Sequence, residues 1–295
     1  MYELKGEALT IQVEGKGAEL KSLKENADGT EYMWSADPKY WSRTSPVLFP
    51  FVGRLKGKQY VYRGKTYEMT PHGFARDMEF ALLAQTEDSL RFGIRDTEET
   101  RAVYPFSFAF EICYSLSGKE LKVSFLVRNE GEEEMFFSLG AHPGFVCPKP
   151  EGGKAVCRRS ECFIGFDEEE QIVSRGVDIH TGLVSDRYTT YQLEDGLLPI
   201  ADNLFENDAL VLEGEQVHRV SLMNADRKPY VTLKMDAPVY GIWSNVDPEA
   251  PFICIEPWFG RCDAWNFEGS LEEREYQTRL AAGEVFETAY TVTLE

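Results

Sequence analysis

The chain has 295 residues, of which 43% are hydrophobic and 27% are charged, so it can bury a sizeable core in one large domain or two ordinary ones. Its 50 acidic and 31 basic residues give a net charge of −19. Such a surface repels phosphate backbones and anionic headgroups, which argues against nucleic acid and membranes as partners. A small anionic ligand is still allowed, because salt screens distant charges and a local cationic pocket can outweigh them.

The sequence contains no recognisable targeting segment. The first residues, MYELKGEALTIQVEG, lack the basic region and apolar run of a signal peptide, and no window approaches a membrane span of ~20 apolar residues. We therefore expect a cytoplasmic protein. The six cysteines form no Cys-x-x-Cys pair and have no zinc-finger spacing, so we expect them to be reduced and mostly buried.

Apolar and polar residues alternate with a period of two from the first residues onward, which is typical of strands. Residues 8–13 and 18–23 open the pattern. Residues 59–64 and 65–69 are two such runs that meet at Gly64-Lys65, which indicates a hairpin. Residues 78–86 and 89–96 indicate a second hairpin around Glu87-Asp88.

The clearest hairpin is FSFAFEICYSL followed by ELKVSFLVRN, residues 106–116 and 120–129, around a turn that contains Gly118. The apolar face of each run needs a partner layer, which favours one sheet packed on another. Further strand-like runs follow at residues 208–213, 218–223, 229–235, 252–258 and 284–295.

Helical periodicity is scarce, with short candidates only at residues 38–41 and 97–102. We read the polar, glycine-rich stretch from Lys149 to Arg158 as a long loop and the acidic run from Asp167 to Glu170 as a solvated loop. The prediction is an all-β fold, a large antiparallel β-sandwich that forms a single domain over residues 1–295.

Four segments interrupt the strand pattern and place a polar residue beside glycine or proline, where the backbone can leave a strand sharply. They are FPFVGR (49–54), TPHGFAR (70–76), GAHPGF (140–145) and CIEPWFGR (254–261). Aromatic residues neighbour each of them. Aromatic faces beside a few polar groups suit a sugar ring, which has apolar C–H faces and a rim of hydroxyls.

His142 and Glu256 are the strongest candidates for chemistry. Glu256 follows the apolar run Phe252 to Ile255, so burial should raise its pKa and make it a better base near neutral pH. A histidine beside it could transfer the opposite proton. The alternative is structural, with Glu256 paired to an arginine and His142 capping a turn.

The remaining candidates are weaker. We expect surface or structural roles for His180 and His218, and Ser138 and Ser244 lack the context of a nucleophile elbow. A metal site built from two histidines and a carboxylate has no supporting ligand spacing, and no phosphate loop or dinucleotide motif is present, so we expect no metal and no cofactor.

Taken in order, Gly-Arg, Pro-His-Gly-Phe, His-Pro-Gly-Phe and Glu-Pro-Trp resemble the motifs of the aldose 1-epimerase (mutarotase) family, and in particular its short LacX-type branch. The resemblance covers nearly the whole chain. It implies the galactose mutarotase-like supersandwich, with a sugar cleft across one sheet.

The resemblance also implies roles for individual residues. His142 would be the general acid at the ring oxygen and Glu256 the general base at the anomeric hydroxyl. His72 and Arg54 would bind the sugar, although the family often has Asn before this arginine and here there is Gly53. An aspartate that holds sugar hydroxyls would be Asp208, with Asp202 as the rival.

The expected activity is the interconversion of α and β anomers of an aldose without a cofactor, and the partner is a small sugar or sugar phosphate. A non-catalytic sugar-binding protein is the rival from another class. Phe74 and Trp258 are the aromatic residues expected in the cleft, and Arg76 would hold a phosphate unless it pairs with Asp77 or Glu79. The chain would act as a monomer or homodimer.

Overall fold

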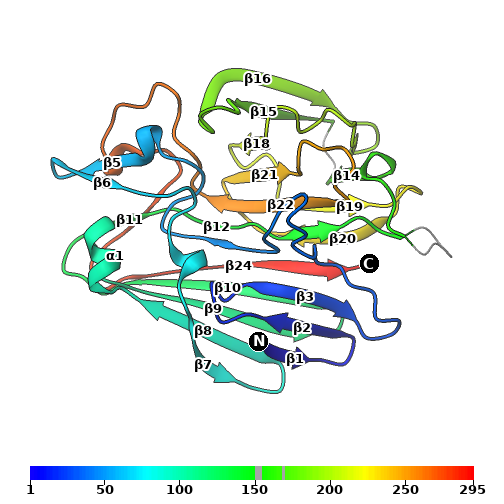
Figure 1. The fold of residues 1–295 in the computed structure, drawn as a ribbon, viewed down its shortest axis with the longest axis horizontal. Helices are drawn as coiled ribbons and strands as arrows, with labels where there is room; N and C mark the ends of the chain where they lie inside the picture. The colour runs from blue at the N-terminus through cyan, green and yellow to red at the C-terminus, as the bar shows by residue number, and fades with distance from the viewer. Residues whose placement is uncertain (150–154, 168–169) are drawn as a thin grey trace.

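The computed structural model describes residues 1–149, 155–167 and 170–295, and it consists almost wholly of antiparallel strands (Figure 1). The larger sheet has nine strands in the order β17-β14-β19-β20-β24-β10-β9-β8-β7. They are β7 (Ala81–Gln85), β8 (Ser89–Arg95), β9 (Phe108–Ser117), β10 (Glu120–Asn129), β14 (Phe163–Phe166), β17 (Leu197–Pro199), β19 (Arg219–Met223), β20 (Pro229–Lys234) and β24 (Val285–Leu294).

The second sheet has eight strands. Seven follow in the order β16-β15-β18-β21-β22-β12-β4, and β13 also pairs with β22, beside β12. Its strands are β4 (Val47–Leu48), β12 (Leu139–Ala141), β13 (Gly144–Val146), β15 (Gln171–Val177), β16 (Val184–Gln192), β18 (Leu210–Glu213), β21 (Val239–Trp243) and β22 (Phe252–Phe259). In Figure 1 this sheet lies above β24, β10 and β9 of the larger one.

Three small sheets and a few short helices complete the described chain. The small sheets are β1 (Tyr2–Lys5) with β2 (Leu9–Val13) and β3 (Leu20–Glu25), β5 (Gln59–Tyr62) with β6 (Lys65–Glu68), and β11 (Met135–Phe137) with β23 (Thr278–Leu280). The helices are α1 (Glu98–Val103) and the 3₁₀ turns η1 (Lys56–Lys58), η2 (Ala75–Asp77), η3 (Arg159–Glu161) and η4 (Leu271–Glu273). Within the described ranges, no helix has the length and apolarity needed to cross a membrane.

The predicted hairpins are confirmed. β9 and β10 pair from Ser117↔Glu120 to Phe108↔Asn129, and β7 and β8 pair around residues 86–88. β5 and β6 meet through Arg63 and Gly64, whose φ angles of 50° and 75° are those that a tight two-residue hairpin turn requires. Alternation and turn chemistry therefore determine these pairings locally.

A single buried cluster joins both large sheets, which confirms the predicted antiparallel sandwich. It contains Phe110 and Val123 from the nine-stranded sheet together with Ile242 and Ile255 from the eight-stranded sheet. All four are at most 1% exposed. Burying one such side chain contributes about 1.5–3 kcal/mol, so this layer is the main stabilising feature of the fold.

The two helical expectations differ in outcome. Helix α1 is confirmed, because Thr97 caps it: the Thr97 hydroxyl accepts from the Thr100 amide at 3.2 Å and the Thr97 amide donates to the Thr100 hydroxyl at 2.8 Å. The helix expected at residues 38–41 is wrong, because this segment forms a turn. Residues 150–154 of the expected long loop and residues 168–169 of the acidic run lie outside the described residues.

Candidate active site

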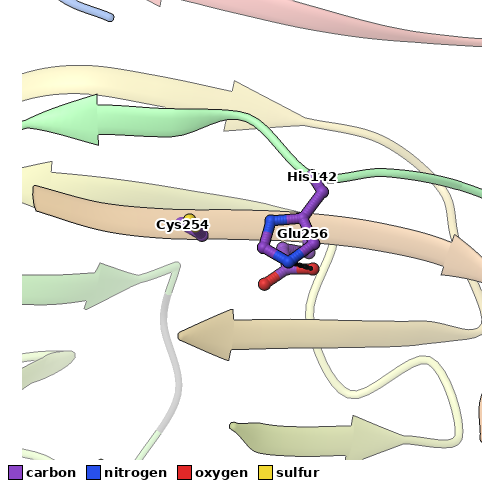
Figure 2. Close-up of side chains that lie close together, drawn as sticks. All are labelled: His142, Cys254 and Glu256. Carbon is purple, nitrogen blue, oxygen red and sulfur yellow. Dashed lines mark ion pairs between the residues drawn. The ribbon is translucent and has the colours of Figure 1, made fainter. Parts of the chain in front are cut away.

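Strand register brings His142 and Glu256 together. β12 pairs with β22 through Gly140↔Trp258, and β13 pairs with the same strand through Gly144↔Cys254. Both pairs have the same register, so the residue midway between Gly140 and Gly144 stands opposite Glu256. That residue is His142, followed by Pro143, and Figure 2 shows its ring over the Glu256 carboxyl group.

The two side chains form a close, buried pair. The Nε2 atom of His142 lies 3.2 Å from Oε2 of Glu256, and the side chains are 11% and 1% exposed. Burial, and then the charge of Asp208, raises the pKa of Glu256 well above its usual value. Burial lowers the pKa of His142 to about 3. Both shifts favour uncharged side chains, a protonated Glu256 and a neutral His142.

Two tryptophans that were not singled out from the sequence enclose this pair. Trp41 stacks on the imidazole of His142 with ring centroids 4.7 Å apart, and Trp243 meets it edge-on at 5.8 Å. Trp41 directly follows the turn at residues 38–40, and its carbonyl accepts a hydrogen bond from the Trp34 indole at 2.8 Å. The two rings remove water from one side of the imidazole and thereby maintain its low pKa.

His72 joins the pair from a different segment of the chain. Its ring centroid lies 5.8 Å from that of His142, and its Nδ1 accepts the Gly53 amide at 3.2 Å. Burial and then the neighbouring His142 and Arg76 lower the pKa of His72 well below its usual value. The bond from Gly53 leaves Nε2–H as the proton-bearing edge of a neutral ring, so His72 can donate a hydrogen bond to a ligand.

The backbone conformation and packing at position 53 require a glycine before Arg54. Gly53 has a φ of +71°, and a Cβ atom there would lie 2.6 Å from Cβ of Cys262 and 2.7 Å from its amide nitrogen. An asparagine could adopt this φ but could not avoid the contact with Cys262. Arg54 itself is exposed and reaches into the cleft described below.

Arg43 and Arg76 form a cationic cluster near His72 and His142. Arg76 donates to the carbonyl of Pro71 at 2.6 Å, and its buried Nε atom has no hydrogen-bond partner. Asp77 forms an ion pair with Arg43 at 2.8 Å and lies 3.8 Å from Nε of Arg76, so Arg43 is the main partner of this carboxylate. Burial and the charge of Arg43 lower the pKa of Arg76. The expected pairing of Arg76 with Asp77 is therefore weak, and Arg43 was not foreseen.

A cleft of about 1970 Å³ lies in the same part of the fold, although His72, Arg76, His142 and Glu256 are not among its lining residues. Arg54, Phe74 and Asp208 line it as expected, and so do Pro71, the neighbour of His72, and the exposed indole of Trp265. Asp202, the rival of Asp208, is not among the lining residues. Burial raises the pKa of Asp208, and the charge of Arg54 opposes that shift.

His180, for which we expected a surface or structural role, is exposed on the wall of the same cleft. Neither its cleft position nor that of Trp265 has a signal in the local sequence, since both depend on loops that meet only in the folded chain.

Trp258 lies under the site rather than in the cleft wall. It is 6% exposed, belongs to a small core cluster with Leu48 and Val52, and its ring fills the space where Cβ atoms would stand on Gly140 and Gly241. Arg261, from the same segment, is 3% exposed and forms ion pairs with Glu213 and Glu275. Trp258 lies on the same face of β22 as Glu256, two residues away, and its indole opposes the effect of burial on the pKa of that carboxyl group.

The other residues considered from the sequence have ordinary surroundings. His218 is half exposed and lies 3.3 Å from Asp236. The hydroxyl of Ser244 donates to the carbonyl of Phe252 at 2.8 Å. Asp167, at the start of the acidic run, is exposed and pairs with Arg219 at 3.2 Å.

One set of side chains among the described residues has the geometry to hold a metal ion. The donor atoms of His142, Cys254 and Glu256 lie within 4.8 Å of one another, and all three residues are buried (Figure 2). A nitrogen, a thiol and a carboxylate suit zinc. Burial raises the pKa of Cys254 well above its usual value, so its thiol keeps its proton and competes poorly for an ion.

Comparison with known proteins finds relatives that match nearly the whole chain. The family model "Aldose 1-epimerase" matches residues 1–287. The chain is 33% identical over 302 residues to the plasmid-encoded protein LacX of Lactococcus lactis, covering 99% of this chain and 98% of LacX. A galactose mutarotase related enzyme from Lactobacillus acidophilus superposes with a TM-score of 0.91 at 34% identity, covering 100% of this chain and 97% of that one.

A galactose mutarotase-like protein from Lactobacillus casei superposes with a TM-score of 0.89 at 26% identity, with both chains fully covered. The match of a family model to almost the whole chain, together with relatives above 30% identity, establishes the relationship. The chain belongs to the aldose 1-epimerase family.

Proposed function

We propose that this protein is an aldose 1-epimerase that interconverts the α and β anomers of a sugar, with residues 1–295 acting as one domain. The observation that carries the proposal is the buried His142–Glu256 pair, whose Nε2 and Oε2 atoms lie 3.2 Å apart, near a cleft lined with polar and aromatic groups. A reaction that needs one proton donor and one acceptor, and nothing else, matches this pair.

In the forward step, Glu256 removes the proton of the C1 hydroxyl while His142 protonates the ring oxygen. The bond between C1 and the ring oxygen breaks, and its electrons go to that oxygen as C1 becomes an aldehyde. The aldehyde rotates, and the ring closes on its other face with the two proton transfers reversed. No electron leaves the sugar, so no cofactor is required.

Ring closure restores both groups, but in the free protein the proton must first move from Glu256 to Nε2 of His142 before ring opening can begin. Ring opening leaves Glu256 protonated and His142 neutral, which is the state that burial already favours in the free protein. The 3.2 Å contact gives the proton a direct route back to Nε2. A sugar hydroxyl that donates to Glu256 would stabilise its carboxylate and promote that return.

The surrounding residues would orient the sugar. We assign His72 and Arg54 to sugar hydroxyls near the reacting atoms and Asp208 to hydroxyls further along the ring. Phe74 offers an apolar face within the cleft, and Trp258 supports the strand that carries Glu256. Each assignment follows the family resemblance and is consistent with the position of the residue.

Polarimetry on freshly dissolved α-glucose and α-galactose tests the proposal. The protein should accelerate the approach to anomeric equilibrium well beyond the buffer rate, and heat-denatured protein should not. A non-catalytic sugar-binding protein, the rival from another class, would bind these sugars without changing that rate. Binding without acceleration on any aldose or aldose phosphate would refute the epimerase assignment.

A second candidate substrate is an aldose 6-phosphate. The observation that favours it is the Arg43–Arg76 cluster, which leaves the buried Nε of Arg76 free and concentrates positive charge beside His72 in a protein of net charge −19. A dianionic phosphate would satisfy both guanidinium groups. The same assay with glucose and glucose 6-phosphate compares the two substrates.

A further inference from the structure

Three of the six cysteines gather at one place away from the candidate active site. Cys147 follows β13, and Cys157 and Cys162 flank the turn η3. The amide of Cys157 donates to the carbonyl of Pro148 at 2.9 Å, which returns the chain to the end of β13. The amide of Cys162 donates to the carbonyl of Arg159 at 2.9 Å and closes the η3 turn. These backbone bonds bring the three thiols into one buried group.

Two of these thiols are much closer to each other than packing requires. The Sγ atoms of Cys157 and Cys162 lie 3.1 Å apart, and a disulfide needs about 2.0 Å, so closure takes a shift of about 1 Å. Among the described residues, the cysteines do not form a set of three donors compact enough for a metal ion. Their geometry suits a sulfur–sulfur bond between two of them.

We propose that Cys157 and Cys162 are a modification site, a dithiol that a hydroperoxide converts reversibly into a disulfide. The thiolate of Cys157 attacks the peroxide, the O–O bond breaks, and the sulfur becomes a sulfenic acid as water or an alcohol leaves. The thiol of Cys162 then attacks that sulfur, the S–O bond breaks and water leaves. Two electrons pass from the thiols to the peroxide, and an added dithiol reductant restores them.

Cys157 is suited to the first step. Hydrogen bonds from Cys147 and then Cys162 lower its pKa to about 4, so it is a thiolate at neutral pH, and only the thiolate attacks peroxides. Cys157 is 7% exposed and its neighbours Ala155 and Arg158 are exposed, whereas Cys147 and Cys162 are fully buried. Peroxide therefore reaches Cys157 first.

Cys147 has a different part in the group. Hydrogen bonds to Cys157 and then Cys162 raise its pKa, so it keeps its proton and serves as the donor that stabilises the Cys157 thiolate. Its removal should slow the reaction without preventing the bond between the other two.

The test uses the full-length protein treated with equimolar hydrogen peroxide at neutral pH, followed by alkylation of free thiols and peptide mapping. We expect the loss of two thiols, a cross-linked peptide that joins Cys157 to Cys162, and full recovery with dithiothreitol. The rate of thiol loss should fall at least ~10-fold in Cys157→Ser but not in Cys113→Ser, a matched control at the most accessible of the six thiols.

Mapping of the wild-type protein keeps the test valid if a serine variant folds poorly. A cross-link between Cys147 and either partner, oxidation at Cys113 with all three clustered thiols intact, or stable sulfinic acid at Cys157 would each overturn the proposal. None of these measurements depends on epimerase activity, so the two assignments can fail separately.

Discussion

His142 and Glu256 face each other with Nε2 and Oε2 3.2 Å apart, although His142 lies between β12 and β13 and Glu256 lies on β22. Burial shifts their pKa values in opposite directions. The pair can hold one proton with little charge, which is the requirement for a group that gives and takes protons within one turnover.

Removing either member of the pair should abolish most of the activity and spare the fold. We expect Glu256→Gln and His142→Asn each to lower kcat/KM by at least ~100-fold, since each loses one proton-transfer group. Circular dichroism and sugar binding should change little. The matched controls are Glu111→Gln on β9 and His218→Asn, which lie elsewhere. Wild-type anomerisation rates in either of the first two variants would contradict the role assignment.

The pH profile should reflect the shared proton rather than an ordinary histidine. In the free protein the pair gains a second proton only near the depressed pKa of His142, about 3, and loses its single proton only above the raised pKa of Glu256. We expect kcat/KM to stay flat through pH 6.5, where an unperturbed histidine would titrate. A clear acid limb centred near pH 6.5 would show that His142 is not depressed.

The buried carboxyl group should also make stability depend on pH. The pKa of Glu256 is raised in the folded state, so between its unfolded value of 4.5 and its folded value the unfolded chain releases a proton that the folded chain keeps. This contribution to stability is complete below pH 4.5 and is lost as the pH rises.

Glu256→Gln removes the titrating carboxyl group, so the variant does not lose this stability as the pH rises. Urea unfolding of wild type and variant should therefore give a stability difference that moves in favour of the variant from pH 5 to pH 8. A difference that is constant with pH would mean that the pKa of Glu256 is not raised.

Trp265 should contribute to sugar affinity. Its indole is 52% exposed on the cleft wall, and contact with an aromatic face is worth about 0.5–1.5 kcal/mol. Trp265→Ala should then raise KM by about 2- to 12-fold with little change in kcat. Tyr188→Ala removes an equally exposed aromatic residue that does not line this cleft and serves as the control. An equal effect of both variants would point to general destabilisation.

Substrate charge can be tested at the arginine cluster. If glucose 6-phosphate is preferred over glucose, Arg76→Ala and Arg43→Ala should each reduce kcat/KM for the phosphate by about 10- to 150-fold, the range for a lost hydrogen bond to a charged group. Glucose turnover should be nearly unchanged, and Arg91→Ala, an exposed arginine on β8, should affect neither substrate. Equal losses on both sugars would assign the cluster to the fold or to the shape of the cleft.

Local signals in the sequence account for the parts of the fold that could be predicted. Alternation and turn residues define the hairpin of β9 and β10, and Thr97 marks the start of α1. The short run at residues 38–41 has a cap, since the Asp37 carboxylate accepts the Lys39 amide at 2.9 Å, but it is only one turn long and ends at Trp41, which packs on His142.

The site was predictable in its residue types and less so in its arrangement. Motif order points to His142, Glu256 and His72, but contact between them depends on pairing of strands more than 100 residues apart, which no local pattern encodes. Trp41 and Arg43 lie near His142 although about 100 residues separate them from it in the chain, and Trp243 reaches His142 from β21, the neighbour of β22. Trp258 has the composition of a cleft residue, yet the glycines on both neighbouring strands draw its ring into the core.

The common register of β12 and β13 along β22 restricts how this site can change during evolution. Side chains alternate between the two faces of a sheet, so inserting or deleting one residue between Gly140 and Gly144 would either turn the imidazole away from Glu256 or break the register of one flanking strand. Insertions that preserve the pair must therefore fall outside this five-residue window. Length variation among homologues should be absent there and tolerated in the loops that form the cleft wall.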